Sequence, residues 1–206
     1  MSDMKTLIAI PAMSMCPVPF AYSLATLRRD CPSKISIISG AAVHEARNAL
    51  AIEAIDNGCD RVLWLDSDMV FDDDLMIRLG EDLDAGWDMV CGIYFKRRLP
   101  ITPVIYRDIN DMSGEIETYK EYPRDSLFPI AGCGFGAVMT TTALLKEVAD
   151  AYDTLPFTPM PKLSEDLSFC MRAKNLGAKI GCDSRIKVGH VGQITFGEQM
   201  YHRSEK

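Results

Sequence analysis

The chain has 206 residues, of which 48% are hydrophobic and 25% charged, a composition that excludes a disordered or collagen-like protein. A chain of this length buries roughly 70% of the surface that it exposes when unfolded, so it can form a core without disulfide or metal support. The net charge of −7, from 22 basic and 29 acidic residues, argues against general nucleic-acid binding, which needs a basic surface.

The first half of the chain alternates between short apolar runs and helical segments. We expect strands at 6–10, 35–38, 61–65 and 89–95, with helices at 20–29, 43–57 and 75–83 between them. The run RVLWL at 61–65 does not alternate polar and apolar residues, so both its faces should be covered, as in a central parallel strand. This order predicts an α/β protein with an open, mostly parallel sheet and helices on both faces.

The second half is less regular. Segments 100–106 and 115–119 are expected to pair as strands, and a glycine-rich turn at 132–136 leads to a strand at 138–140. Helices at 143–152 and 164–176 and short strands at 179–182 and 186–188 complete the prediction. The glycine-rich turn lacks the strand-helix frame of a dinucleotide fingerprint, so NAD is not inferred. With no linker or repeat, residues 1–206 are interpreted as one domain.

Cysteine usage and apolar run lengths predict a cytoplasmic protein without a membrane anchor of its own. The seven cysteines include no CxxC pair, so a disulfide framework or zinc site is not indicated. The apolar stretch before Pro11 is too short for a signal peptide, and no other stretch approaches the about 18 residues of a spanning helix.

Two carboxylates follow the best predicted central strand, in the sequence VLWLDSDMVF. Asp66 and Asp68 can converge, because residues two apart on an extended chain point to one side. Open α/β sheets bind ligands at this end of their strands. Convergent carboxylates repel unless a cation lies between them, and oxygen ligands favour Mg²⁺ or Mn²⁺. The residues therefore predict a metal site at Asp66 and Asp68, whereas the acidic run 72–74 is interpreted as the start of the next helix.

Three further groups have both a structural and a functional interpretation. Arg47 should project near the apolar face of its helix, where it needs a carboxylate or phosphate partner. Glu165 and Asp166 open a helix behind Ser164, either as charges that complement the helix dipole or as a general base. His190 ends a strand and is either structural or a ligand for an Mn²⁺-type ion. The basic run 96–98 is interpreted as a solvated strand end, with contact to phosphate or to an anionic acceptor as the alternative.

Four apolar residues followed by DxDxV are also typical of haloacid-dehalogenase-like phosphatases, in which Asp66 would be the nucleophile. That fold begins with this strand, whereas here a strand-helix-strand-helix unit precedes it. It also needs a later acidic pair at a strand end, and the only candidate, Glu165-Asp166, opens a helix instead. The phosphatase is therefore the alternative hypothesis, together with a nucleotidyltransferase on a related fold and a non-catalytic sugar-binding module.

As an ordered set, these motifs resemble GT-A glycosyltransferases of the family-2-like type found in bacteria and phages. The resemblance covers most of the chain and rests on the first strand ending in Pro11, EARNALA, DRVLWLDSDMVF, CGIYFKR, AGCGFG, SEDLSFCMRAKNLG and GHVG. It implies a Rossmann-like GT-A domain that transfers a sugar, as hexosyltransferases do, from a UDP- or GDP-sugar to a hydroxyl of a saccharide, protein or modified polymer.

The resemblance also implies roles for individual residues. Asp66 and Asp68 would form the DxD motif that holds Mn²⁺ or Mg²⁺, with His190 as the third ligand. Pro11, Arg47, Asn48 and Asp66 would contact the nucleotide or its phosphates, and Asp166, or alternatively Glu165, would act as base or orient the acceptor. Residues 1–98 would bind the nucleotide-sugar, and residues 99–206 would form the acceptor side and supply the last metal ligand.

Overall fold

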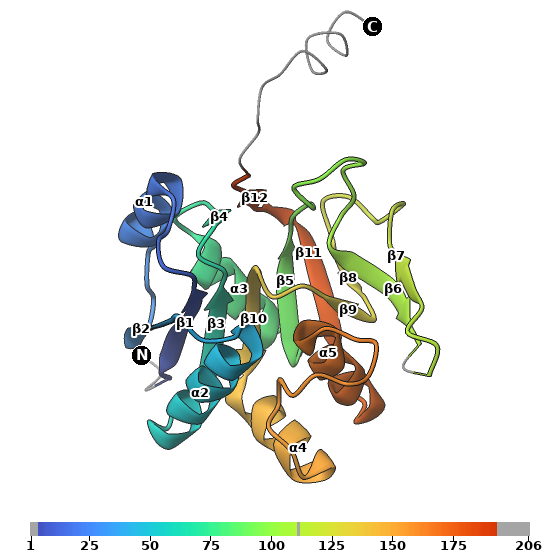
Figure 1. Ribbon diagram of the computed structural model, residues 1–206. Helices are drawn as coiled ribbons and strands as arrows, with labels where there is room; N and C mark the ends of the chain where they lie inside the picture. Colours follow the sequence, from blue (N-terminus) through green and yellow to red (C-terminus); the bar gives the residue numbers. More distant parts are fainter. Residues whose placement is uncertain (1–3, 111, 193–206) are drawn as a thin grey trace, which may run out of the picture.

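A computed structural model describes residues 4–110 and 112–192 (Figure 1). Its centre is a seven-stranded sheet in the order β2-β1-β3-β10-β5-β11-β8. The bounds are β1 Thr6–Ala12, β2 Ser33–Ser39, β3 Arg61–Leu65, β5 Met89–Ile93, β8 Leu127–Pro129, β10 Ala137–Thr141 and β11 Ile180–Lys187. Only β10 and β8 run antiparallel to their neighbours, which confirms the expected open, mostly parallel sheet.

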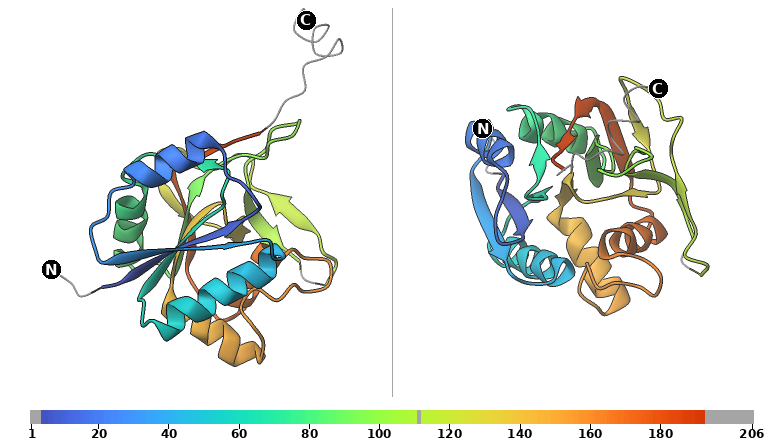
Figure 2. Two further views of the ribbon diagram at one scale, coloured as in Figure 1. Left: turned by 60° about the vertical axis from the view of Figure 1, so that its left-hand side comes forward. Right: turned by 45° about the horizontal axis from the view of Figure 1, so that its top comes forward.

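Helices cover both faces of this sheet (Figures 1 and 2). One face carries α1 (Val18–Thr26) and α3 (Leu75–Asp84), and the other carries α2 (Val43–Asp56), α4 (Thr142–Tyr152) and α5 (Glu165–Asn175). Strand β3 separates two cores, because Val62 and Trp64 pack on the α2 side while Leu63 and Leu65 pack on the α3 side. The expectation that both faces of this strand are covered is confirmed.

Two small sheets border the central one. Strands β7 (Ile116–Thr118), β6 (Ile105–Ile109) and β9 (Gly132–Cys133) form a three-stranded sheet, so the expected pairing in this region is present, although β6 begins later than predicted. Strands β4 (Met69–Val70) and β12 (Gly189–His190) form an antiparallel pair with His190 opposite Met69. This short pair brings the end of β11 beside the turn that follows β3.

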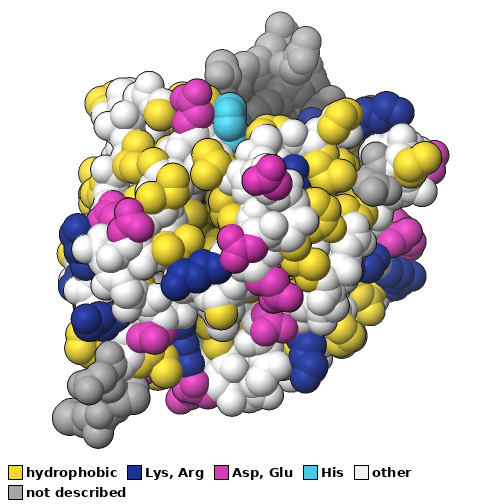
Figure 3. All heavy atoms as spheres, turned by 90° about the horizontal axis from the view of Figure 1, so that it is seen from below, with side chains coloured by type: hydrophobic (Ala, Val, Ile, Leu, Met, Phe, Trp, Pro, Cys, Tyr) yellow, Lys and Arg dark blue, Asp and Glu magenta, His cyan; other side chains and the backbone are white. Residues whose placement is uncertain are grey.

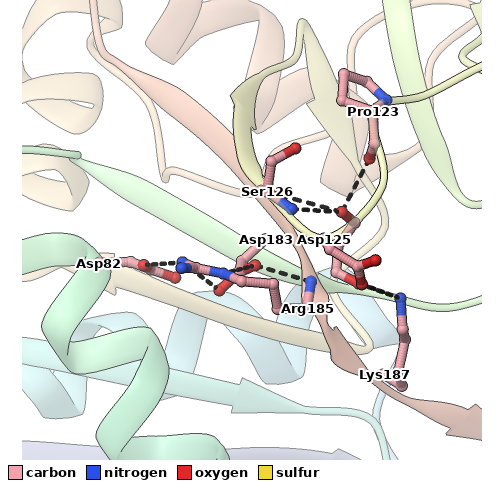
Figure 4. A network of polar contacts seen from close by, with 8 residues as sticks. Asp82, Pro123, Asp125, Ser126, Asp183, Arg185 and Lys187 are labelled. Atoms are coloured by element: carbon pink, nitrogen blue, oxygen red, sulfur yellow. Dashed lines mark hydrogen bonds and ion pairs between the residues drawn. The ribbon is translucent and has the colours of Figure 1, made fainter.

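The two short strands expected at 179–182 and 186–188 are one strand, β11, with an irregular register between Asp183 and Lys187. Polar residues in its middle explain the difference, because they look like a loop in the sequence but have partners in the structure (Figure 4). Arg185 lies between the buried carboxyl groups of Asp82 and Asp183, with 2.8 Å from its Nε to Asp183 Oδ1. The hydroxyl of Ser184 donates to the Pro123 carbonyl at 2.9 Å.

The glycines of AGCGFG permit close packing beneath the ends of the central strands. A Cβ at Gly134 would overlap the Tyr94 hydroxyl, and a Cβ at Gly136 would lie 2.8 Å from Met69 Cε. None of these glycines has a positive φ, in contrast to Gly58 and Gly177, which follow α2 and α5 as predicted for helix ends. These glycines are therefore required because neighbouring side chains pack close to the backbone, and not because the backbone adopts an unusual conformation.

The surface carries charges of both signs. The face in Figure 3 shows acidic and basic side chains interspersed among apolar ones. Within the described part of the chain, no helix is long and apolar enough to cross a membrane.

Candidate functional site

Asp66 and Asp68 lie in the turn between β3 and β4, at the carboxyl end of a central strand. The Asp66 amide donates to the Gly136 carbonyl at 3.0 Å, and the Met69 amide donates back to the Asp66 carbonyl at 3.2 Å. The glycine-rich segment thus fixes the first residue of the turn, and the turn reverses the chain within three residues. Ligands of open α/β sheets bind at this position.

The Asp68 carboxylate is the meeting point of two cationic or ionisable side chains. Its Oδ2 lies 2.6 Å from Nη1 of Arg97 and 3.6 Å from Nε2 of His190. Burial alone would raise the pKa of Asp68, but the hydrogen bond from His190 and the charges of His190 and Arg97 outweigh it and lower that pKa. Asp68 is therefore held as a carboxylate.

His190 has one ring nitrogen assigned by the backbone. Its Nδ1 lies 3.0 Å from the Phe95 carbonyl, which can only accept a hydrogen bond, so Nδ1 carries a proton. Nε2 therefore faces Asp68, as a donor when the ring is charged and as a lone pair when it is neutral. The hydrogen bond to Asp68 and the Phe95 carbonyl raise the pKa of His190 against the effect of burial.

Arg47 projects from α2 into the space between β3 and α5. Its side chain is only 3% exposed, and it donates to Asp66 Oδ1 at 2.9 Å and to Glu165 Oε1 at 2.5 Å. Its guanidinium also lies 5.3 Å from the centre of the Phe135 ring. The carboxylate partner expected for this buried arginine is present twice, and both partners come from the predicted site.

Glu165 and Asp166 begin α5 and differ in their surroundings. Burial, with a smaller contribution from the nearby Asp166, raises the pKa of Glu165 despite the ion pair with Arg47. The Asp166 carboxylate accepts from the Leu167 amide at 2.7 Å and from the Ser164 hydroxyl. Ser164 is the N-cap residue by position, but its hydroxyl binds Asp166 instead of a helix amide.

The other two residues that the resemblance assigned to the nucleotide are packed inside the protein. The side-chain carbonyl of Asn48, which is 6% exposed, accepts from the Phe157 amide at 2.8 Å and so connects α2 to the loop before α5. Pro11 is buried within β1, opposite Ile38 of β2.

The ligand atoms of this site suit a divalent cation. Asp68 Oδ2 and His190 Nε2 also lie close enough, at 3.6 Å, to bind the same ion. A carboxylate oxygen and an imidazole nitrogen, with Nδ1 held by a backbone carbonyl, are typical of Mn²⁺-type sites. Asp66 instead binds Arg47. Among residues 4–110 and 112–192, no three His, Cys, Asp or Glu side chains lie close enough together to hold a metal ion.

Tyr94 and Phe135 belong to this site but were not singled out from the sequence. Arg97 was interpreted within the basic run 96–98 as a solvated strand end, with contact to an anion as the alternative, and in the structure it pairs with Asp68. The Tyr94 hydroxyl accepts from the Gly136 amide at 3.3 Å, and burial raises its pKa well above 10. Residues 94–97 could have been assigned to the site from their position in the sequence. They follow β5, which ends on the same side of the sheet as β3.

Cavities of about 480 and 460 Å³ lie elsewhere, along the β6–β7 hairpin, where charged side chains such as Arg107 and Glu117 line them. They contain none of the residues that surround Asp68. The candidate site is therefore defined by its polar contacts and its place in the sheet.

Comparison with known proteins shows similarity in fold without close similarity in sequence. No protein-family model matches the chain, and no curated protein sequence matches it significantly. The structure is similar to that of A197 from STIV, with a TM-score of 0.69 and 21% identity over 92% of this chain and 87% of that one. It is also similar to GalNAc-T7, crystallised with UDP, GalNAc and Mn²⁺, with a TM-score of 0.63.

The chain has a GT-A-like fold. The second match has 10% identity and covers 93% of this chain but only 44% of the GalNAc-T7 chain, so this chain spans less than half of that protein. At these identities the likeness concerns the fold.

Proposed function

We propose that this protein is a metal-dependent glycosyltransferase that transfers a hexosyl group from a UDP- or GDP-sugar to an acceptor hydroxyl. The observation that carries the proposal is the meeting of Asp68 and His190 at the carboxyl end of β3, 3.6 Å apart, in a GT-A-like fold. A structural neighbour, GalNAc-T7, was crystallised with UDP, GalNAc and Mn²⁺, which supports a nucleotide-sugar and a divalent cation as the class of ligands.

Asp68 and His190 would hold the cation, Mn²⁺ or Mg²⁺, and Asp66 would join them as the third ligand only by turning away from Arg47. When bound, such an ion offsets the negative charge of a departing nucleoside diphosphate. The Phe95 carbonyl keeps Nε2 of His190 directed at Asp68, and Arg47 holds Asp66 through a hydrogen bond of 2.9 Å. We propose that Arg47 supports the nucleotide site through Asp66, and that Asn48 does so through its contact with Phe157. Pro11 would support the same site from β1.

Asp166 is the better candidate for the group that handles the acceptor. The Glu165 carboxylate is committed to Arg47, whereas Asp166 is half-buried at the start of α5 and has one oxygen bound by Ser164 and Leu167. Asp166 would accept a hydrogen bond from the acceptor hydroxyl, and in an inverting reaction it would take the proton. On this proposal residues 1–98 bind the donor and residues 99–206 form the acceptor side of one domain.

Calorimetry with UDP and GDP, each with and without Mn²⁺, tests the proposal. We expect one nucleotide to bind in a metal-dependent manner, and Asp68→Asn to weaken that binding by at least about tenfold because a charged ligand is lost. Asp72→Asn is the matched control, since it removes the same charge from the exposed acidic run and should change the affinity by less than about twofold. Wild-type protein that binds neither nucleotide with Mn²⁺ would refute the proposal.

The reaction products separate the alternatives. A glycosyltransferase releases a nucleoside diphosphate from a nucleotide-sugar, whereas a nucleotidyltransferase releases pyrophosphate. A dehalogenase-type phosphatase would form a phosphoenzyme at Asp66, an acyl phosphate, and hydrolyse small phosphate esters. A binding module without catalysis would bind the nucleotide-sugar and release neither product.

A further inference from the structure

Arg97 closes a small ring of contacts around Asp68. Its guanidinium donates from Nη1 to the Val191 carbonyl at 3.0 Å and lies 2.6 Å from Asp68 Oδ2. The Val191 amide in turn donates to the Asp68 backbone carbonyl at 2.8 Å. Arg97 therefore connects the segment after β5, the Asp-x-Asp turn and the segment after β12.

The oxygen that Arg97 neutralises is the one that faces His190. Nε2 of His190 and Nη1 of Arg97 both point to Asp68 Oδ2. A divalent cation held between Asp68 and His190 would use this oxygen, and a guanidinium at hydrogen-bond distance from the same oxygen would repel it. The two cations are therefore alternatives for one carboxylate.

The side chain of Arg97 is free to change conformation, whereas the backbone beside it is held by a hydrogen bond. The side chain is 50% exposed, so the guanidinium can turn into solvent without opening the core. The preceding residue is fixed, because the Lys96 amide donates to the Thr102 carbonyl at 2.9 Å. A guanidinium released from Asp68 would be free to bind phosphate oxygens, for which its planar fork of donors offers paired hydrogen bonds.

We propose that Arg97 neutralises Asp68 in the turn 66–68 when no metal is bound, and that a divalent cation displaces it. The released guanidinium then binds the diphosphate of the donor. This inference rests on the proposed function for its second half only. The first half, the exchange at Asp68, concerns the metal alone.

Two binding measurements test the exchange. The first is a titration with Mn²⁺ alone, in which binding is measured as the loss of the electron paramagnetic resonance signal of the free ion. Arg97→Gln should bind Mn²⁺ about tenfold more tightly than wild type, because the competing charge is gone. The second is binding of UDP and GDP at saturating Mn²⁺, where Arg97→Gln should bind about tenfold more weakly, because a phosphate ligand is gone.

Arg98→Gln is the matched control, because it removes the same charge from the adjacent exposed position. It should change both affinities by less than about twofold, since a rim charge acts only through the screened field. Arg97→Lys keeps the charge without the planar fork, so it should restore weak Mn²⁺ binding while leaving nucleotide binding impaired. Thermal unfolding of each variant checks that the fold is intact.

The outcomes are distinguishable. Equal Mn²⁺ affinity in wild type and Arg97→Gln, or no Mn²⁺ binding by either, overturns the exchange. Tighter Mn²⁺ binding by Arg97→Gln with unchanged nucleotide affinity overturns the diphosphate role. Failure of wild type to bind any nucleotide with Mn²⁺ refutes the proposed function, while the titration with Mn²⁺ alone still decides whether Arg97 competes for Asp68.

Discussion

Replacing Arg47 with Met should destabilise the protein strongly, because the side chain connects two acidic groups in a buried place. Removing one partner of a buried ion pair typically costs 3–5 kcal/mol. Asp66 is 33% exposed and can regain water, whereas Glu165 is 15% exposed and cannot do so without opening the start of α5. The contact with the Phe135 ring adds about 0.5–1 kcal/mol. We therefore expect a loss of about 3 kcal/mol in the free energy of unfolding.

Urea denaturation measures this loss, and a double-mutant cycle shows how much of it comes from the pair between Arg47 and Glu165. For a chain of this size the loss corresponds to a fall of about 6–12 °C in melting temperature. Adding Glu165→Gln to Arg47→Met should recover at least about 1 kcal/mol relative to the sum of the single effects, because the stranded carboxylate is then neutral. Arg107→Met is the control, since its pair with Glu117 is exposed and 3.5 Å long, and it should cost less than about 0.5 kcal/mol.

A free energy of unfolding for Arg47→Met within about 1 kcal/mol of wild type, the value of an exposed pair, would contradict this expectation. Additive effects of Arg47→Met and Glu165→Gln would contradict it too. Either result would mean that Arg47 does not hold α2, β3 and α5 together through Asp66 and Glu165.

Three further predictions concern pH, packing and thiols. Burial and the neighbouring Asp183 raise the pKa of Asp82 to about 6, so its contribution to stability is full below its unfolded pKa and is lost as the pH rises through about 6. Urea denaturation should therefore show wild type losing up to about 3 kcal/mol relative to Asp82→Asn between pH 4 and 6, and parallel curves would contradict this. Gly134→Ala should cost about 1–3 kcal/mol in thermal unfolding, and less in a Tyr94→Phe background that lacks the overlapping hydroxyl. A thiol reagent should modify the exposed Cys16 first and Cys31 and Cys59 more slowly, whereas four cysteines should react only on unfolding: Cys91, Cys133, Cys170 and Cys182.

Local sequence patterns predicted most elements of the central sheet and its helices. The bounds of β3 are those expected from RVLWL, and α2 ends one residue before the predicted end, with Gly58 in the left-handed conformation after it. Apolar runs and terminal glycines act within a few residues, so they can be recognised without knowledge of the fold.

Long-range pairing could not be predicted in the same way. Strand β10 lies antiparallel between β3 and β5, although its own residues carry no signal of direction. Strands β4 and β12 have only two residues each, which is too short for a periodic pattern. Their pairing is nevertheless what places His190 beside Asp68.

The site shows the same division. The sequence located the carboxylates, because they follow an apolar strand, and it showed that Arg47 needs an acidic or phosphate partner. It did not show that Asp66 and Glu165 share Arg47, nor that Arg97 pairs with Asp68, because each of these pairs joins segments far apart in the chain.

The two arginines of the site neutralise its carboxylates in different ways, and their burial separates their functions. Arg47 is 3% exposed and bound on two sides, so its charge is a fixed part of the structure that holds the side chains of Asp66 and Glu165 in place. Arg97 is 50% exposed and can leave Asp68 without exposing apolar surface. A divalent cation at Asp68 would add positive charge to a turn whose carboxylates are already paired with arginines, and this repulsion favours the displacement of one of the two arginines. Arg97 is the group that can move, whereas Arg47 can do so only if the start of α5 opens.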